Sequence, residues 1–164
     1  MRFQRLEKGV NLLRIGIIGA GKVGTAFGLF LKERGETIGG YASKTEDSAH
    51  RAAVLTDSRV FAEPLDLIRA SDLILLTVVD DQIELLAASL AARLLEVRKN
   101  GGKECLQDKC FVHMSGAHSI TALEPLAAAG YETATLHPLQ SASEVGQAAK
   151  AFGASLFTME AQPG

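Results

Sequence analysis

Short apolar runs alternate along the chain with segments whose apolar residues recur every three or four positions. The runs predict buried strands, and the recurring positions predict amphipathic helices. Strands are expected at residues 12–18, 37–42, 59–61, 73–79, 111–114, 133–136 and 154–158. Helices are expected at residues 22–35, 43–55, 64–68, 82–97, 122–129 and 144–152. This order predicts an α/β fold, a doubly wound and mostly parallel sheet with helices on both faces.

The residues that follow the strands of such a sheet are the first candidates for function. Doubly wound sheets bind ligands at the edge formed by the carboxyl ends of their parallel strands. In this sequence those positions are residues 19–24, 43–44, 80–81, 115–119 and 137.

A G-x-G-x-x-G motif follows the first expected strand and begins the first expected helix. Its residues are Gly19, Ala20, Gly21, Lys22, Val23 and Gly24. In this context the first glycine permits a tight turn, the second lets the backbone approach a pyrophosphate, and the third allows close packing of the helix. The unpaired N–H groups of the helix then favour phosphates. The motif predicts a Rossmann-like dinucleotide-binding domain, and a glycine-rich turn without a ligand is the alternative.

The end of the second expected strand distinguishes the two nicotinamide cofactors. An acidic residue about 20 positions after the last glycine binds the ribose 2′-hydroxyl of NAD. Here that position is Lys44, preceded by Ser43. A hydroxyl group beside an ammonium group suits a 2′-phosphate, so the pair favours NADP, with NAD as the alternative. Ser43 followed by Glu46 also matches a capping box, in which Ser43 begins the next helix.

The strand that ends near residue 79 is the most apolar in the chain, which predicts a central place in the sheet. The backbone of Val78, Val79 and Asp80 would therefore border a cofactor that lies across the strand ends. Asp80 and Asp81 form a carboxylate pair, but Asp81 with Glu84 also resembles a helix cap, and acidic residues suit a helix start. We expect capping rather than catalysis from this pair.

Three histidines lie near expected strand ends. His113 lies inside a strand and is expected to be structural, His118 lies in a loop, and His137 precedes a proline at a strand exit. A histidine beside a cofactor can exchange a proton with a substrate. The spacing of the three matches no local zinc motif, so no metal is predicted, and a metal-dependent hydrolase that uses these histidines is an alternative. Ser115 is no hydrolase nucleophile, since His113 and Ala117 stand where G-x-S-x-G requires glycines.

Composition excludes several other classes of protein. The chain has 164 residues, with 17 Lys and Arg against 19 Asp and Glu, which gives a net charge of −2 and no basic surface for nucleic acid. No apolar stretch is long enough to span a membrane, and the N-terminus does not resemble a secretory signal. The two cysteines, Cys105 and Cys110, do not complete a metal site, and Cys110 is expected to be a small buried residue. We expect a cytoplasmic protein.

Four motifs together resemble a family of NAD(P)-dependent oxidoreductases. They are G-A-G-K-V-G at 19–24, T-V-V-D-D at 77–81, H-M-S-G-A-H-S at 113–119 and L-H-P-L-Q at 136–140. This family is part of the superfamily that includes 6-phosphogluconate dehydrogenase, pyrroline-5-carboxylate reductase and prephenate dehydrogenase. The resemblance covers residues 12–157 and implies a Rossmann-like domain that is normally followed by a helical C-terminal domain.

The resemblance also implies roles for two residues. In relatives such as prephenate dehydrogenase, a serine after one strand and a histidine in an H-P motif face the nicotinamide and contact substrate. Ser115 and His137 occupy those positions here. His137 is then the acid or base and Ser115 a hydrogen-bond partner of the reacting group, in hydride transfer between NADP(H) and a small molecule. Purely structural hydrogen bonds of both residues are the alternative.

The domain organisation follows from the same resemblance. Residues 1–11 are expected to form an N-terminal extension and residues 12–164 the NAD(P)-binding domain, with no residues left for the helical domain. We expect a fragment of a longer protein rather than a stand-alone module, with apolar surface that favours self-association, for example as a homodimer. The alternative function is that of a non-catalytic dinucleotide-binding or sensor module.

Overall fold

A single sheet of seven strands organises the computed structural model, which describes residues 13–101, 106–139 and 144–161. The strands are β1 (Arg14–Ile18), β2 (Thr37–Ala42), β3 (Arg59–Val60), β4 (Leu73–Leu76), β5 (Cys110–His113), β6 (Glu132–Pro138) and β7 (Phe157–Ala161). Their order in the sheet is β3-β2-β1-β4-β5-β6-β7. All neighbouring pairs are parallel except β6 and β7. The predicted α/β fold and its mostly parallel sheet are confirmed.

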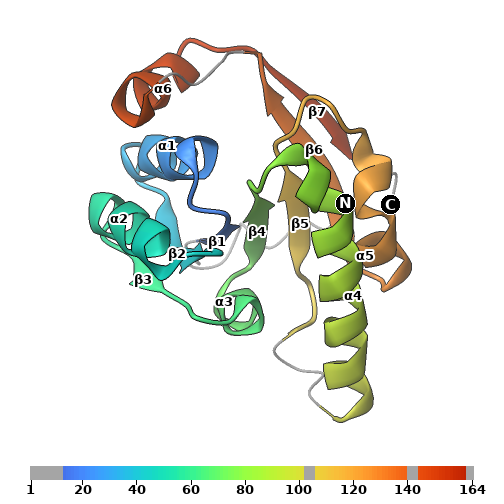
Figure 1. The fold of residues 1–164 in the computed structure, drawn as a ribbon. Coiled ribbons are helices and arrows are strands. Elements are labelled where there is room, and N and C mark those ends of the chain that lie inside the picture. The colour runs from blue at the N-terminus through green and yellow to red at the C-terminus, as the bar shows by residue number, and fades with distance from the viewer. Residues whose placement is uncertain (1–12, 102–105, 140–143, 162–164) are drawn as a thin grey trace, which may run out of the picture.

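Helices cover both faces of the sheet (Figure 1). They are α1 (Lys22–Lys32), α2 (Glu46–Thr56), α3 (Pro64–Ala70), α4 (Ile83–Lys99), α5 (Glu124–Ala128) and α6 (Val145–Phe152), with short 3-10 helices η1 (Asp80–Gln82) and η3 (Ile120–Leu123). One core cluster joins α1, α2 and α6 to the sheet, and the other joins α3, α4 and α5. Successive residues of a strand point to opposite faces of the sheet and so belong to different clusters. In β4, Leu75 packs in the cluster of α1, α2 and α6, whereas Ile74 and Leu76 pack in the cluster of α3, α4 and α5.

An aromatic cluster holds the last elements of the chain against the first helix. The ring of Phe27 in α1 lies 5.3 Å from that of Phe152 in α6, edge to face, and 6.0 Å from that of Phe157 in β7. Phe30 adds contacts to Phe27 and Phe152 at 5.6 Å and 5.8 Å. Such ring pairs stabilise packing beyond the area they bury. The cluster therefore fixes α6, and with it the antiparallel strand β7, relative to α1.

The boundaries of several elements differ from those expected. The central strand β4 ends at Leu76 instead of residue 79, because the Thr77 hydroxyl donates to the carbonyl oxygen of Gly19 at 2.6 Å and the backbone leaves the sheet there. The last strand begins at Phe157 rather than at residue 154. No helix in the described ranges is long and apolar enough to cross a membrane.

Of the two cysteines, only Cys110 lies within the described residues. Cys110 is a free, partly buried cysteine, and burial raises the pKa of its thiol to about 11. Its thiol is therefore protonated and unreactive at neutral pH, which agrees with a structural role. Cys105 lies outside the described residues.

A tight contact between α1 and β2 gives the first testable prediction. A Cβ atom added at Gly28 would lie 2.0 Å from the hydroxyl oxygen of Tyr41, which is fully buried. We expect Gly28→Ala to lower the free energy of unfolding by about 1–3 kcal/mol, because the ring must move within a packed core. Urea denaturation measures the change.

A matched glycine provides the control for that substitution. Gly146 lies in α6, is exposed, and has nothing within 4 Å of the position its Cβ would take. Gly146→Ala is expected to raise the free energy of unfolding by about 0.5–1 kcal/mol through helix propensity. Effects of the same sign for the two variants would contradict the packing argument.

Candidate functional site

The turn between β1 and α1 is built around Gly19. Its φ of +111° lies in the left-handed region that favours glycine, and its N–H donates to the carbonyl oxygen of Ala42 in β2 at 2.8 Å. A Cβ atom here would lie 2.7 Å from the carbonyl carbon of Thr77. The turn therefore needs glycine for both its conformation and its close approach to the segment after β4.

Gly24 brings α1 equally close to the same turn. A Cβ atom at Gly24 would lie 2.2 Å from the carbonyl oxygen of Gly19 and 2.3 Å from the hydroxyl oxygen of Thr77. This geometry matches the roles expected for the first and third glycines of the motif in turning and packing. Thr77 was not predicted to take part, although a hydroxyl residue at the end of an apolar strand was a signal for it.

The middle glycine differs from the other two because it faces open space. Gly21 is the N-cap of α1, is exposed, and has no atom within 4 Å of its Cβ position. No side chain caps this helix, and its first turn carries no acidic residue. The N–H groups at the start of α1 and their partial positive charge therefore lie at an open position, with no capping side chain among the described residues.

The other residues of the motif support this loop. Lys22 is exposed, and Val23 packs against the core cluster of α1, α2 and α6. The Ala20 N–H donates to the hydroxyl oxygen of Ser43 at 3.4 Å. The structure thus joins the loop after β1 to the loop after β2, which are far apart in sequence.

The capping role expected for Ser43 is wrong. Helix α2 begins at Glu46 with Thr45 as its N-cap, and the Thr45 hydroxyl donates to Ser48 Oγ at 2.7 Å. Ser43 instead faces the glycine loop, as described above, and Lys44 beside it is exposed. In contrast to α1, the first turn of α2 carries Glu46 and Asp47, which already compensate its dipole.

The segment after β4 lies beside the glycine loop, as expected from the topology. Val78 is partly buried against the cluster of α3, α4 and α5, whereas Val79 is 72% exposed. The cap predicted at Asp81 is wrong, because Asp80 and Asp81 belong to the 3-10 helix η1 and Gln82 is the N-cap of α4, without a side-chain bond. The turn η1 intervenes between strand and helix, so the carboxylates do not reach the N–H groups of α4.

The structure brings Ser115 and His137 to neighbouring positions. Gly116, the residue after Ser115, lies against the imidazole ring of His137, since a Cβ atom there would lie 2.3 Å from Cε1 and 2.4 Å from Nε2. Ser115 is 8% exposed, and its hydroxyl oxygen accepts a hydrogen bond from the Ala117 N–H at 3.1 Å. Nδ1 of His137 is buried and has no hydrogen-bond partner within the described part of the chain. Gly116 was not predicted as a contact, although it lies within the S-G-A motif.

His113 is structural, as expected, and both of its ring nitrogens are engaged. The Ser115 N–H donates to Nδ1 at 3.2 Å, and Nε2 lies 3.1 Å from the carbonyl oxygen of Ser119. The side chain is fully buried. Burial lowers the pKa of His113 below its ordinary value, although the Ser119 carbonyl opposes this shift. The ring is therefore neutral at physiological pH.

The third histidine belongs to a shallow acidic pocket. His118 Nδ1 lies 3.5 Å from Glu84 Oε1, which connects the loop after β5 to the first turn of α4. Together they border a pocket of about 520 Å³ that Asp80, Asp81, Leu85, Ala88 and Pro125 also line. Within residues 13–101, 106–139 and 144–161, no group of three His, Cys, Asp or Glu side chains is arranged to hold a metal ion.

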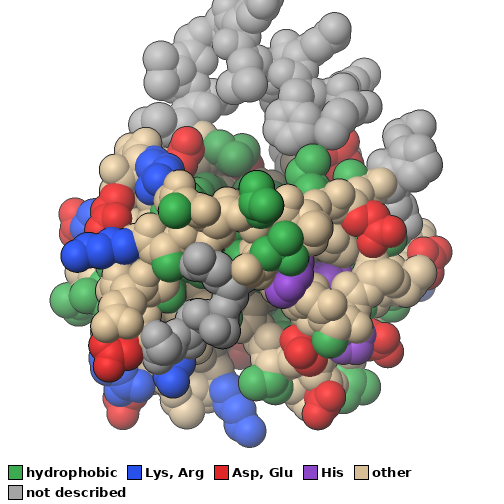
Figure 2. All heavy atoms as spheres, turned by 90° about the horizontal axis from the view of Figure 1, so that it is seen from above, with side chains coloured by type: hydrophobic (Ala, Val, Ile, Leu, Met, Phe, Trp, Pro, Cys, Tyr) green, Lys and Arg blue, Asp and Glu red, His purple; other side chains and the backbone are tan. Residues whose placement is uncertain are grey.

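Charged side chains are unevenly distributed around this edge of the sheet. Figure 2, a view from above Figure 1, shows histidine side chains on the right with acidic side chains around them, and Lys and Arg side chains mainly on the left. Three carboxylates, those of Asp80, Asp81 and Glu84, line the pocket beside His118, whereas Lys22 in the glycine loop and Lys44 after β2 are exposed cations. An anionic ligand is electrostatically favoured at the glycine loop rather than at the pocket.

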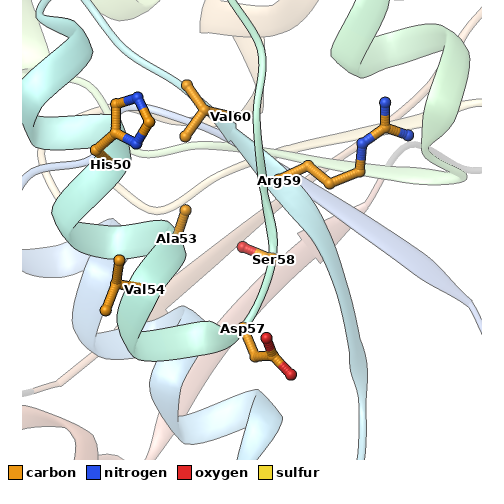
Figure 3. A pocket seen from close by; sticks show the side chains of 7 residues that line it. All are labelled: His50, Ala53, Val54, Asp57, Ser58, Arg59 and Val60. Atoms are coloured by element: carbon orange, nitrogen blue, oxygen red, sulfur yellow. The ribbon is translucent and has the colours of Figure 1, made fainter.

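A second pocket, of about 640 Å³, lies away from these residues. It is formed where α2 ends and β3 begins, at the amino ends of the parallel strands rather than at their carboxyl ends. The side chains of His50, Asp57 and Arg59 lie apart there and do not converge on one point (Figure 3). This pocket offers no arrangement of polar groups for chemistry.

Comparison with known proteins establishes the family. A family model described as Rossmann-like domain matches residues 6–138, which is most of the chain. The chain belongs to the Rossmann-like domain family. This assignment confirms the Rossmann-like domain that the glycine motif predicts. No curated protein shows significant similarity to this Rossmann-like domain.

Solved structures share the fold at low sequence identity. A Bacteroides fragilis protein described as an NADP oxidoreductase has a TM-score of 0.63 at 22% identity and covers 92% of this chain and 52% of its own. Pyrroline-5-carboxylate reductase of Coxiella burnetii has a TM-score of 0.64 at 14% identity, with coverages of 81% and 46%. An imine reductase of Pseudomonas has a TM-score of 0.58 at 17% identity, and the match covers 79% of this chain and 42% of the reductase. The Rossmann-like domain therefore spans about half the length of these proteins.

The lowered pKa of His113 predicts how the stability of the domain depends on pH. Below about pH 6.5 the unfolded chain binds a proton at this histidine that the folded protein does not, so the free energy of unfolding falls as the pH falls. We expect His113→Asn to flatten this dependence, because Asn does not titrate. Urea denaturation at several pH values between about 7.5 and 5.5 measures it.

The exposed His50 provides the control. It lies on the surface of α2, where its ring is 61% exposed beside Glu46. His50→Asn makes the same substitution at an exposed position and so controls for effects that do not depend on burial. Equal slopes for the wild type and His113→Asn would contradict the prediction.

Proposed function

We propose that this chain is the NADP(H)-binding domain of an oxidoreductase that transfers hydride between NADP(H) and a small molecule. The observation that carries the proposal is the uncapped start of α1 at Gly21, which lies in open space within a glycine loop of the required geometry. The similarity of the fold to nicotinamide-dependent enzymes supports it, including a reductive aminase from Aspergillus terreus in complex with NADPH.

The residues around this loop fit the parts of a dinucleotide. The N–H groups at Gly21 and Lys22 would bind the pyrophosphate, and Ala20 would line the turn with its N–H held by Ser43. Lys44, exposed at the end of β2, would bind the 2′-phosphate of NADP with its ammonium group. An imine reductase from Myxococcus stipitatus shares the fold and is described in complex with NAD+, so the choice of NADP rests on Lys44.

The remaining assigned residues would border the nicotinamide and the substrate. When bound, the cofactor supplies or accepts the hydride. The Ser115 hydroxyl accepts one hydrogen bond from Ala117, so its proton is free to be donated to a substrate oxygen or nitrogen. His137, against Gly116, would exchange the proton that accompanies hydride transfer, since an imidazole ring can both accept and donate a proton. Val78, Val79 and Asp80 would flank the cofactor.

We further propose that the domain of residues 12–164 works with a second domain or a second copy, as in a homodimer. Two facts support this: the similar structures are about twice as long, and large apolar side chains are exposed near the site. They are Val79, Leu85, Leu139, Leu156 and Met159. A cytoplasmic location is supported by the free thiol of Cys110, which suits a reducing compartment.

Isothermal titration with NADPH and NADH tests the proposed cofactor site. We expect NADPH to bind more tightly, and Lys44→Ala to weaken NADPH binding about tenfold while leaving NADH binding unchanged, because only NADPH carries the 2′-phosphate. Lys99→Ala is the control, since Lys99 is exposed at the opposite end of α4 and should have no effect. Failure to bind either nucleotide would refute the proposal, and equal losses for both nucleotides would refute the role of Lys44.

Turnover of NADPH with a panel of imines and ketones tests the proposed proton exchange. Once a substrate is found, His137→Gln should lower kcat by about 10²–10⁴-fold while the Kd for NADPH stays unchanged. Ser115→Ala should also reduce kcat without weakening the binding of NADPH. Tight NADPH binding without turnover of any compound would favour a non-catalytic binding module, and full activity of His137→Gln would exclude this histidine as the acid.

A further inference from the structure

The loop at residues 115–119 connects β5 to η3 and carries the serine and glycine of the proposed substrate site. Both ends of this loop are attached to one side chain, the imidazole of His113. The Ser115 N–H binds Nδ1 at the first residue of the loop, and the carbonyl oxygen of Ser119 lies beside Nε2 at its last residue. A single ring thus spans the loop from start to end.

These two contacts determine where the proton of the ring resides. A backbone N–H can only donate, so Nδ1 must present a lone pair to Ser115. A carbonyl can only accept, so Nε2 must carry hydrogen and donate to Ser119. Only the neutral Nε2–H form of His113 satisfies both bonds. In the charged form, two N–H groups would face each other at Ser115.

Other contacts hold the far part of the loop. The Ser119 hydroxyl oxygen accepts a hydrogen bond from the Thr121 N–H at 3.4 Å, and the Ile120 N–H donates to Glu160 Oε2 in β7 at 3.1 Å. These bonds act on the end that continues into η3. The start of the loop, which carries Ser115 and Gly116, is attached through its backbone to His113.

The start of the loop is also the part that contacts His137. The backbone of Gly116 lies against the His137 ring so closely that no side chain fits between them. A small displacement of residues 115 and 116 would therefore open this contact and move the Ser115 hydroxyl. The position of both proposed reacting groups depends on the bond between Ser115 and His113.

We propose that His113 is a positioning residue whose neutral Nε2–H form holds Ser115 and Gly116 against His137. This inference rests on the proposed function of Ser115 and His137. His113 itself touches no substrate, because it is fully buried. The charged groups that act on its ring are His118, which disfavours its protonation, and Asp80 and Glu160, which favour it. Burial dominates and keeps the ring neutral.

Nuclear magnetic resonance of the whole chain tests the proposal without a nucleotide or substrate. In the wild type at pH 7.5, the ring ¹⁵N shifts of His113 should show a protonated Nε2 and an unprotonated Nδ1. A nuclear Overhauser effect should connect an α-proton of Gly116 to the Cε1 proton of His137. A different tautomer, or a charged ring, would overturn the proposal with no substitution needed.

Two variants test the two hydrogen bonds of the His113 ring separately. In His113→Asn the amide oxygen can replace Nδ1 as the acceptor for Ser115, and in His113→Gln the amide nitrogen can replace Nε2 as the donor to Ser119. We expect His113→Asn to keep the Gly116–His137 signal and the protection of the Ser115 amide against exchange. His113→Gln should weaken that signal and accelerate exchange about 3- to 10-fold, as expected for the loss of one hydrogen bond. His50→Asn is the control.

The result is independent of the outcome of nucleotide titration. If His113→Gln leaves both the Gly116–His137 signal and the Ser115 amide unchanged, the positioning role is wrong even where NADPH binds. If the wild type binds no nucleotide but the variants behave as expected, the proposed function fails while the contact between His113 and the loop stands. If His113→Gln does not fold, two measurements still test the proposal. The wild-type ring must show the Nε2–H tautomer, and His113→Asn must retain the Gly116–His137 signal.

Discussion

The close approach of the β1–α1 turn to the end of β4 is the constraint on which the site depends. At this crossing the backbone of Gly19, the backbone of Gly24 and the hydroxyl of Thr77 occupy a space that admits no further carbon atom. The Thr77 hydroxyl donates to the Gly19 carbonyl at 2.6 Å, just after β4 ends at Leu76. Because of this contact, the start of α1 lies directly over the carboxyl ends of the two central strands. Gly21 lies between these two tightly packed glycines and itself faces open space.

Much of this arrangement was predictable from local pattern. The strands, the helices and the glycine motif each leave a signal within a dozen residues, and the structure has them in the expected order. The predictions for the site that failed are two helix caps, and both concern side chains that could form hydrogen bonds with more than one partner. Ser43 had a suitable helix ahead of it but bonds to Ala20, and Asp81 enters a 3-10 turn instead of capping α4. A side chain with two available partners takes the one that tertiary packing brings near, and local sequence does not contain that information.

The contacts between distant segments were also beyond local pattern. Residues 115–119 and 137 were both predicted as candidates, since each follows an expected strand. That Gly116 lies against the His137 ring depends on the register of β5 with β6, in which His113 pairs with Thr135. The motifs indicated which residues to consider, and the sheet register brought them into contact.

The two halves of the site are joined through the core as well as along the edge of the sheet. Helix α1 presents its N-terminus at the glycine loop, and its Phe27 packs against Phe152 of α6 and Phe157 of β7. Strand β7 pairs with β6 so that Thr158 lies opposite His137. Packing on one face of the sheet thus sets the position of α1 relative to the strand that carries His137. In the proposed function, this aromatic contact would keep an anion at the start of α1 and the His137 side chain at a constant separation, which the proposed hydride transfer with an accompanying proton would require.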